Sequence, residues 1–304
     1  MTFTAGRIPD QSGRVFVITG GNSGIGLASA HLLAARRATV VLACRDPRKA
    51  EVAAGVLRGS VPGADVQTVV LDLASLRSVR ACADTLRDRF EKIDVLLNNA
   101  GVMAIPERVT EDGIEMQMGT NHFGHFALTG LLLDSIAARV VTVGSLLHRR
   151  GELQLADIPR PARYDPKRQY AASKLSNLLF AYELDRRLKR AGRPLISVAC
   201  HPGYSATNLH RVGAMMRGSA LTVAASRLVG AVFAQSAASG ALAALRAAVA
   251  ADVLGGEYIG PTGLVGLRGD PVKATSSAAS HDREAASKLW TISEQLTGVR
   301  CAIE

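Results

Sequence analysis

The chain has 304 residues, of which 48% are hydrophobic and 20% are charged, so it is long and apolar enough to bury a large core and is not a disordered protein. Its formal net charge is +10, but the basic residues are scattered along the sequence and aromatic residues make up only 4%. This distribution disfavours a nucleic-acid-binding protein and favours a solvated basic surface, which would suit an anionic cofactor.

The cysteines and the apolar segments bear on location. The four cysteines lie far apart, at Cys44, Cys82, Cys200 and Cys301, so they predict neither a disulfide framework nor a metal site and agree with a reducing, cytoplasmic location. Residues 1–13 contain no apolar secretion signal, and polar residues interrupt the alanine-rich run 228–254. We therefore expect no secretion and no integral membrane association.

Apolar, strand-like runs alternate with helix-like segments along the chain. The runs cover residues 14–19, 39–44, 66–71, 93–97, 139–143, 195–200 and 257–259. The helix-like segments between them include residues 47–57, 75–90, 116–133 and 167–191. Strict alternation predicts an α/β fold with a doubly wound, parallel, seven-stranded sheet. The runs are almost wholly apolar, as expected for strands that are buried on both faces.

A glycine-rich turn follows the first strand-like run. Residues 19–26 read Thr-Gly-Gly-Asn-Ser-Gly-Ile-Gly and lead into an apolar, helix-like segment. Glycines allow positive φ and close backbone approach, and the N-terminus of a helix presents unpaired N–H groups to an anion. The spacing meets the general dinucleotide fingerprint only in part. This sequence predicts a phosphate-binding site. The alternative is that the glycine-rich turn connects the strand to the helix and binds no ligand.

Ligands of such sheets bind beyond the carboxyl ends of the strands, so the residues that follow each run are the candidates for ligand binding. Arg45 and Asp46 follow the second run. An arginine here suits the 2′-phosphate of NADP, whereas an acid suits the free ribose of NAD. Arg45 therefore favours NADP(H), and NAD(H) remains possible if Asp46 binds the ribose.

The other strand ends also carry polar or small residues. Asp72 follows the third run, where it suits either an adenine amine or the N-cap of the next helix. Residues 98–101 read Asn-Asn-Ala-Gly, Ser145 follows the fifth run, and residues 201–207 read His-Pro-Gly-Tyr-Ser-Ala-Thr after the sixth.

A tyrosine and a lysine in the helix-like segment 167–191 suggest proton transfer. Tyr170 and Lys174 are four residues apart and so project from one face of a helix. A nearby ammonium would lower the pKa of a phenol from its usual value near 10 toward neutrality. Isolated pairs of this kind occur by chance, but Ser145 and Asn121 add a hydroxyl and an amide to the same predicted region.

The glycine turn, Asn-Asn-Ala-Gly, Ser145, Tyr-x-x-x-Lys and Pro-Gly occur in this order, and in this the chain resembles the short-chain dehydrogenase/reductase superfamily over about residues 14–260. Residues 42–46, 98–103, 121–126 and 173–177 are similar to the branch that includes retinol dehydrogenases and light-dependent protochlorophyllide reductase. The resemblance implies a single Rossmann-type domain over residues 1–304, with a substrate lid at 204–229 and a C-terminal extension at 261–304.

The resemblance also implies a role for each matching residue. Tyr170 would be the proton donor or base, Lys174 would tune it and hold the nicotinamide ribose, Ser145 would bind the carbonyl oxygen, and Asn121 would hold a water that connects Lys174 to solvent. The resemblance places Gly20, Asn22, Ser23, Gly24 and Gly26 at the pyrophosphate, Arg45 at the 2′-phosphate, Asp72 and Leu73 at the adenine, Asn99 near its ribose and Thr207 at the nicotinamide amide. The other cofactor-binding residues that it implies are Ile25, Ala100, Gly101, Tyr170, Lys174, Pro202 and Gly203.

Several residues depart from this pattern or lie outside it. Gly144 stands where the branch often has a second serine, which would loosen the loop beside Ser145. His148 could help to bind an acidic substrate, but the favoured prediction is that it faces water. His122 and His125 lack cysteine or carboxylate partners, which favours packing over a metal site. The predicted terminal helix, residues 281–296, would close the site or pack on a second subunit.

These features together predict an NADP(H)-preferring oxidoreductase that acts on a hydrophobic aldehyde, ketone or alcohol. A nucleotide-sensing protein without turnover and an enzyme at a membrane surface are the rival hypotheses. The residues do not select the substrate, the direction of the reaction or the oligomeric state.

Overall fold

The computed structural model describes the chain except for residues 1, 205–235, 264–265, 302 and 304. Nearly all of the predicted lid, residues 204–229, and Thr207 therefore lie outside the described residues. Among the helices that the structure describes, none combines the length and the apolar character needed to cross a membrane.

The strands form one sheet in the order β3-β2-β1-β4-β5-β6-β7-β8. Their bounds are Val15–Thr19 (β1), Thr39–Cys44 (β2), Val66–Val70 (β3), Ile93–Asn98 (β4), Ile136–Val143 (β5), Ile196–Cys200 (β6), Tyr258–Gly263 (β7) and Arg268–Lys273 (β8). The first seven are parallel, which confirms the predicted doubly wound sheet, and the order reverses between β1 and β4. Parallel strands present their carboxyl ends at one edge, so the strand-end residues named above converge there.

The prediction of seven strands was wrong by one, because β8 pairs antiparallel with β7 at the edge of the sheet. Residues 268–273 read Arg-Gly-Asp-Pro-Val-Lys, and most of them are exposed. Such a polar sequence with an internal proline lacks the apolar pattern of a strand, and proline is tolerated only because this is an edge strand. The pairing with β7 makes it a strand, and that is a long-range contact.

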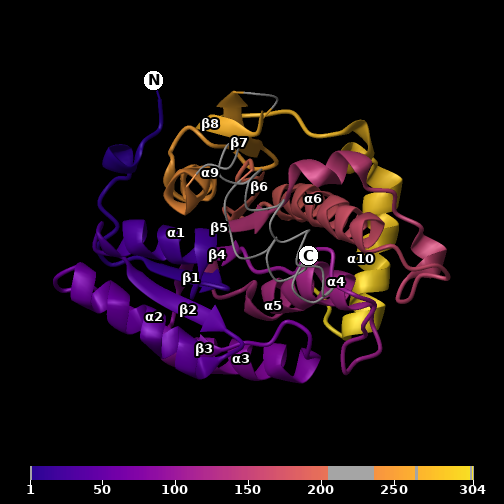
Figure 1. Cartoon of the computed structure of the whole chain (residues 1–304), viewed down its shortest axis with the longest axis horizontal. Coiled ribbons are helices and arrows are strands. Elements are labelled where there is room, and N and C mark those ends of the chain that lie inside the picture. Colours follow the sequence, from indigo (N-terminus) through magenta and orange to yellow (C-terminus); the bar gives the residue numbers. More distant parts are fainter. Residues whose placement is uncertain (1, 205–235, 264–265, 302, 304) are drawn as a thin grey trace, which may run out of the picture.

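Helices cover both faces of the sheet (Figure 1). The helices are α1 (Gly24–Ala34), α2 (Pro47–Ser60), α3 (Leu76–Arg89), α5 (Gly124–Leu132), α6 (Pro166–Arg190), α9 (Ala237–Val249) and α10 (Arg283–Thr297). Phe16 and Ile18 pack with α1, α2 and α9, whereas Val17 between them packs with α3, α5 and α6. This alternation explains why a strand such as β1 has apolar residues on both of its faces.

The predicted helix 116–133 is divided into three parts. A single helical turn, α4 (Met116–Met118), is followed by a π-helical turn, η2 (Gly119–Phe123), and then by α5. Glycines border the π-helical turn: a Cβ at Gly119 would lie 2.5 Å from the Thr110 methyl, and one at Gly124 would lie 2.4 Å from the Leu73 carbonyl oxygen. These close approaches bring the turn against the carboxyl ends of the strands, and such turns occur frequently at functional sites.

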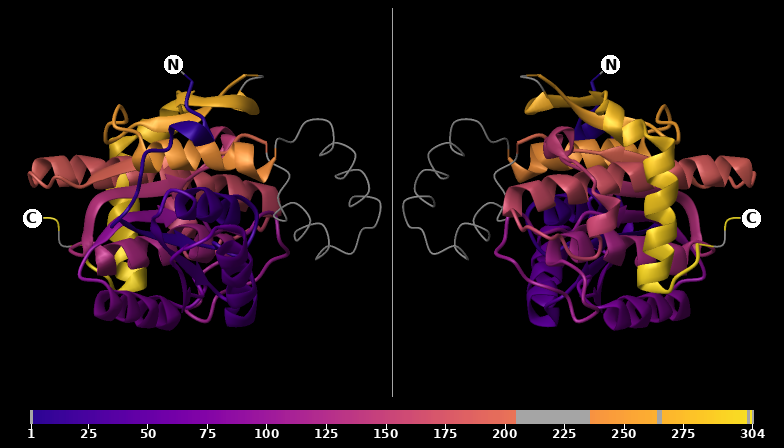
Figure 2. Two further views of the ribbon diagram at one scale, coloured as in Figure 1. Left: turned by 90° about the vertical axis from the view of Figure 1, so that its left-hand side faces the viewer. Right: turned by 90° about the vertical axis from the view of Figure 1, so that its right-hand side faces the viewer.

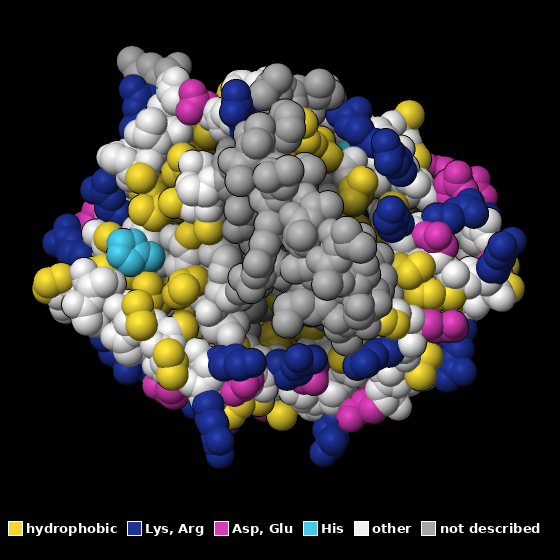
Figure 3. Space-filling view, viewed as in Figure 1, with side chains coloured by type: hydrophobic (Ala, Val, Ile, Leu, Met, Phe, Trp, Pro, Cys, Tyr) yellow, Lys and Arg dark blue, Asp and Glu magenta, His cyan; other side chains and the backbone are white. Residues whose placement is uncertain are grey.

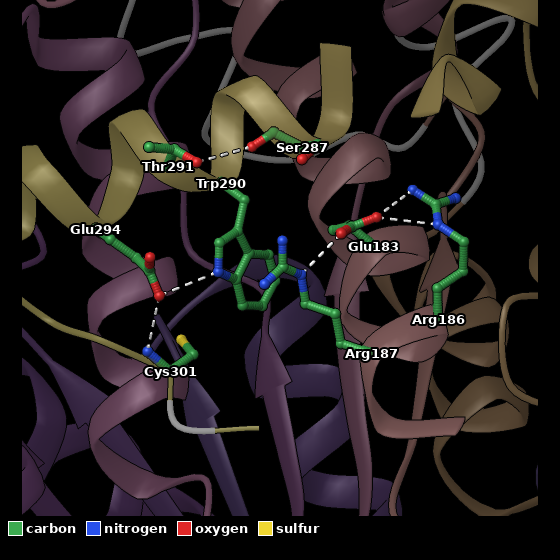
Figure 4. Close-up of polar contacts among 8 residues, drawn as sticks. All are labelled: Glu183, Arg186, Arg187, Ser287, Trp290, Thr291, Glu294 and Cys301. Carbon is green, nitrogen blue, oxygen red and sulfur yellow. Dashed lines mark hydrogen bonds and ion pairs between the residues drawn. The ribbon is translucent and has the colours of Figure 1, made fainter. Parts of the chain in front are cut away.

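The C-terminal helix α10 packs on α5 and α6 of the same chain, and it crosses α6 at the surface (Figure 2). Its Trp290 is almost completely buried between Phe126 and Phe180, while the Arg187 guanidinium lies 4.3 Å from the indole ring (Figure 4). The Glu294 carboxylate accepts hydrogen bonds from the indole N–H and from the backbone of Cys301. The extension is thus part of the core of its own chain.

Candidate active site

The glycine turn between β1 and α1 has a backbone that only glycine adopts easily. Gly20 and Gly24 have φ values of 65° and 54°. A Cβ at Gly26 would lie 2.6 Å from the Gly20 carbonyl oxygen. Ser23 begins α1 without a side-chain hydrogen bond to the first turn, so N–H groups there stay available to a ligand. The turn therefore fits a phosphate group.

A cavity of about 450 Å³ lies at the carboxyl ends of the strands. Most of the residues predicted for cofactor binding line it, namely Gly20, Asn22, Ser23, Gly24, Ile25, Arg45, Asp72, Leu73, Asn99, Ala100 and Gly101. The prediction missed Lys49 and Arg108, which also line the cavity. Lys49 is a basic residue four positions after Arg45, in the first turn of α2, and this closeness in sequence could have indicated it, whereas no pattern marks Arg108. Lys and Arg side chains gather below the grey atoms of Figure 3, over β3 and α3.

The two acids predicted for this end of the cavity are held by the backbone. Asp46 is the N-cap of α2 and accepts hydrogen bonds from the N–H groups of Arg48 and Lys49 at 3.0 and 3.2 Å. These backbone hydrogen bonds, that of Lys49 first, lower its pKa. Asp72 accepts from Ala74, but the N-cap of α3 is Ser75, so the alternative of Asp72 as the helix cap was wrong.

The Asn-Asn-Ala-Gly turn after β4 is tied to the end of β1. The Thr19 hydroxyl oxygen accepts hydrogen bonds from the N–H groups of Asn99 and Ala100, both at 2.9 Å. The Asn99 amide donates to the Thr19 carbonyl oxygen at 2.8 Å. This places Gly101 beside the catalytic candidates, because a Cβ there would lie 3.0 Å from Asn121 Oδ1 and 3.7 Å from Lys174 Nζ.

The four catalytic candidates come together at this point. Tyr170 and Lys174 lie one turn apart on α6, both almost completely buried. Ser145, at the end of β5, lies close enough to the Tyr170 hydroxyl to lower the pKa of the phenol. Lys174 Nζ donates to the Val143 carbonyl oxygen at 2.9 Å and lies 5.9 Å from the centre of the Tyr170 ring. Asn121 belongs to the π-helical turn and donates to the hydroxyl of Ser173, the neighbour of Lys174.

Burial has the largest effect on the pKa values of Tyr170 and Lys174. It raises the pKa of Tyr170 to about 12, an effect that the hydrogen bond from Ser145 opposes. It also lowers the pKa of Lys174 to about 8. The expectation that Lys174 would bring the phenol pKa toward neutrality was therefore wrong for the protein without cofactor, because the removal of the phenol from water determines its pKa.

The Asn121 side chain is engaged by protein atoms. Its Oδ1 accepts from the Val102 N–H at 2.8 Å, and its Nδ2 donates to the Val102 carbonyl oxygen at 2.9 Å. The water-holding role of Asn121 stays a prediction. Gly203 follows β6 with a φ of 68°, and its N–H donates to His201 Nδ1, so His201 supports the turn at Pro202.

The structure corrects two expectations about the loop at Ser145. His148 does not face water: it is fully buried, and it contacts the Ser145 carbonyl oxygen through Nδ1 and the Ser277 N–H through Nε2. Gly144 does not loosen the loop, because a Cβ there would lie 2.6 Å from a Leu178 methyl group. Glycine is what permits this close packing of the loop on α6.

Buried histidines predict that acid destabilises the fold. Burial lowers the pKa of His122 to about 3, of His125 to about 4 and of His201 to about 3, from an ordinary 6.5. Because the unfolded chain binds these protons first, their stabilising contribution is complete above pH 6.5 and is lost as the pH falls toward the folded values. We expect His122→Phe to reduce the slope of unfolding free energy against pH between 6.5 and 4 by about one proton, ~1.4 kcal/mol per pH unit. Urea unfolding at several pH values measures this slope, and an unchanged slope would contradict the assignment.

Comparison with known proteins agrees with this geometry. A family model described as short chain dehydrogenase matches residues 14–214. Human retinol dehydrogenase 13 is 38% identical over 311 residues, which cover 97% of this chain and 89% of that relative. A crystal structure of an uncharacterized protein from Mycobacterium paratuberculosis is 42% identical, with a TM-score of 0.83 and coverage of 99% of both chains. A protein from Beutenbergia cavernae, provisionally assigned as an NAD(P)-dependent gluconate 5-dehydrogenase and solved with NADP, is 26% identical, with a TM-score of 0.63 over 82% of this chain and 96% of that chain.

Proposed function

Because this chain belongs to the short-chain dehydrogenase family, and within it to the retinol dehydrogenase-like branch, we propose that it is an NADP(H)-preferring oxidoreductase in which Tyr170 transfers the proton. Family membership makes it an NAD(P)-dependent oxidoreductase. The proposal adds the preference for NADP, the class of substrate and the roles of the residues. One observation carries the proposal: Tyr170 and Lys174 are buried one helical turn apart, Ser145 acts on the Tyr170 hydroxyl, and Lys174 lies beside Gly101, which lines the same cavity as the glycine turn.

When bound, the nicotinamide supplies or accepts the hydride. The glycine turn and the N-terminus of α1 hold the pyrophosphate, and Gly101 leaves room beside Lys174 for the nicotinamide ribose. In the direction of reduction, Ser145 donates a hydrogen bond to the carbonyl oxygen, and Tyr170 gives this oxygen its proton. A tyrosine with a pKa near 12 is protonated at neutral pH, as a proton donor must be. The charge of Lys174 then stabilises the phenolate that remains.

The preference for NADP rests on the charges around the cavity. Arg45, Lys49 and Arg108 line it, while the Asp46 carboxylate is already engaged as a helix cap. The protein provisionally assigned as a gluconate dehydrogenase is a relative solved with NADP. A 2′-phosphate would thus meet basic side chains, whereas a free ribose would have to compete with the backbone for Asp46.

We expect Arg45→Ala to weaken NADPH binding by roughly 10- to 100-fold, since it removes a hydrogen bond between charged groups. NADH binding should change little. Fluorescence titration with both nucleotides measures the two dissociation constants. Arg48→Ala is the matched control, because Arg48 is an exposed arginine of the same segment that is not among the described residues lining the cavity. Equal losses for NADPH and NADH would remove Arg45 from the 2′-phosphate site.

The substrate that we propose is a small apolar aldehyde, ketone or alcohol, by analogy with relatives named retinol dehydrogenases. We further propose that the chain acts as one domain with a core, a lid and a C-terminal extension, and that it works in the reducing cytoplasm, where its four buried, free cysteines would stay reduced. The oligomeric state stays open.

Turnover tests the proposal directly. Oxidation of NADPH is followed by its absorbance with a panel of apolar aldehydes and ketones, including a retinoid aldehyde. We expect reduction of at least one member of the panel, with a lower rate from NADH. Tight binding of NADPH without turnover of any member would instead favour the nucleotide-sensing alternative.

A further inference from the structure

His125 lies at the start of α5 and is fully buried, and no function above uses it. Its Nε2 lies 2.9 Å from the Thr19 hydroxyl oxygen, and its Nδ1 lies 3.0 Å from the Asn121 carbonyl oxygen. Thr19 ends β1, and Asn121 belongs to the π-helical turn. One ring therefore contacts both the strand that leads into the glycine turn and the segment beside Lys174.

The contacts of Thr19 determine where the ring carries its proton. A hydroxyl group accepts through two lone pairs and donates one hydrogen. The Thr19 oxygen already accepts from the N–H groups of Asn99 and Ala100, both at 2.9 Å. Its hydrogen then has two possible acceptors, the Leu97 carbonyl oxygen at 3.4 Å and His125 Nε2 at 2.9 Å. The shorter contact makes Nε2 the acceptor, so the hydrogen of the neutral ring is on Nδ1 and is donated to Asn121.

These hydrogen bonds form a continuous path that begins at the cavity. It starts at Asn99 and Ala100, which line the cavity, and passes through Thr19 and His125 to Asn121. From Asn121 it continues to the backbone of Val102 and to the hydroxyl of Ser173. All the side chains that link the path, Thr19, His125 and Asn121, are 1% exposed or less. Each partner is held in a single orientation, because a buried polar group left unpaired is costly.

We propose that His125 is a positioning residue: its neutral ring, with the hydrogen on Nδ1, fixes the turn at Asn99 and Ala100 relative to Asn121 and thus to Lys174. The proposal predicts that the distance between the adenosine half and the nicotinamide half of the site depends on this ring. Its kinetic part rests on the proposed function, whereas the position of the hydrogen is a property of the protein alone.

The first test needs no cofactor. Protein with 15N-labelled histidine is studied by long-range 1H–15N correlation spectra, and His125→Gln identifies the His125 signals by their loss. We expect a neutral ring with its hydrogen on Nδ1, unchanged across physiological pH. A hydrogen on Nε2, or protonation near the ordinary histidine pKa, would overturn the proposal.

The second test compares two buried histidines of one segment. His122 precedes His125 by three residues, is equally buried, and bonds to Ser293 of α10 instead of to the path. We expect His125→Phe to weaken NADPH binding roughly tenfold, as the loss of a buried hydrogen bond implies, and to lower kcat as well. We expect His122→Phe to leave the NADPH dissociation constant unchanged, although both variants lower the melting temperature.

A conservative variant separates positioning from packing. Glutamine at position 125 has one donor and one acceptor group, so His125→Gln should recover part of the lost NADPH affinity, and it serves as the test variant if His125→Phe does not fold. Equal NADPH affinities of wild type and both folded His125 variants, or equal losses in the His125→Phe and His122→Phe variants, would overturn the proposal. If the wild-type protein binds no NADPH, the proposed function fails and the spectra alone decide the role of His125.

Discussion

Replacing Tyr170 by phenylalanine should lower kcat for carbonyl reduction by roughly 10²- to 10⁴-fold, the usual contribution of general acid catalysis. The substitution keeps the aromatic ring of a residue that is only 4% exposed and removes the hydroxyl that Ser145 contacts. The NADPH dissociation constant should change far less than kcat, because the cradle of the pyrophosphate is untouched. Single-turnover reduction and fluorescence titration measure the two quantities separately.

Tyr182→Phe is a matched control for this variant. Tyr182 is also a buried tyrosine of α6, but its hydroxyl bonds to Ser276, and Tyr182 is not among the described residues that line the cavity. The Tyr182→Phe variant should have a lower free energy of unfolding than the wild type but the same kcat. If Tyr170→Phe were as active as Tyr182→Phe, Tyr170 would not be the proton donor, and the contact with Ser145 would be structural only.

The features that the sequence predicted correctly are those written in local patterns. The apolar runs locate β1 to β7, because a strand that is buried on both faces is mostly apolar. The glycines at 20, 24 and 26 are required by positive φ and by close backbone approach within a few residues. Tyr170 and Lys174 share a helix face, so their proximity follows from their spacing alone.

The features that it missed depend on contacts between distant segments. β8 is a strand because β7 lies beside it. His148 is buried because Ser277, 129 residues later, supplies an N–H donor. The acidity of Tyr170 depends on how completely the fold removes it from water. The periodicity of a sequence contains no information about such contacts. The position of a residue in the fold was therefore predictable, but its environment was not.

The sequence left the docking of α10 undecided, and we expect Trp290→Ala to lower the free energy of unfolding by ~3–5 kcal/mol, as removal of a buried tryptophan does. Trp290 is 2% exposed and touches Phe126, Phe180 and the Arg187 guanidinium. Glu183 in turn holds Arg187 and Arg186 through its two carboxylate oxygens (Figure 4). Urea unfolding of wild type and variant under the same conditions measures the loss.

Trp290→Phe separates the ring contacts from the hydrogen bond to Glu294. Phenylalanine keeps an aromatic face for Arg187 and loses the indole N–H, so it should cost roughly 1–2 kcal/mol, less than alanine. NADPH affinity should survive in both folded variants, because the described residues lining the cavity include none from α10. An alanine variant as stable as the wild type would mean that α10 is a surface attachment, and that α5 and α6 form a complete layer without it.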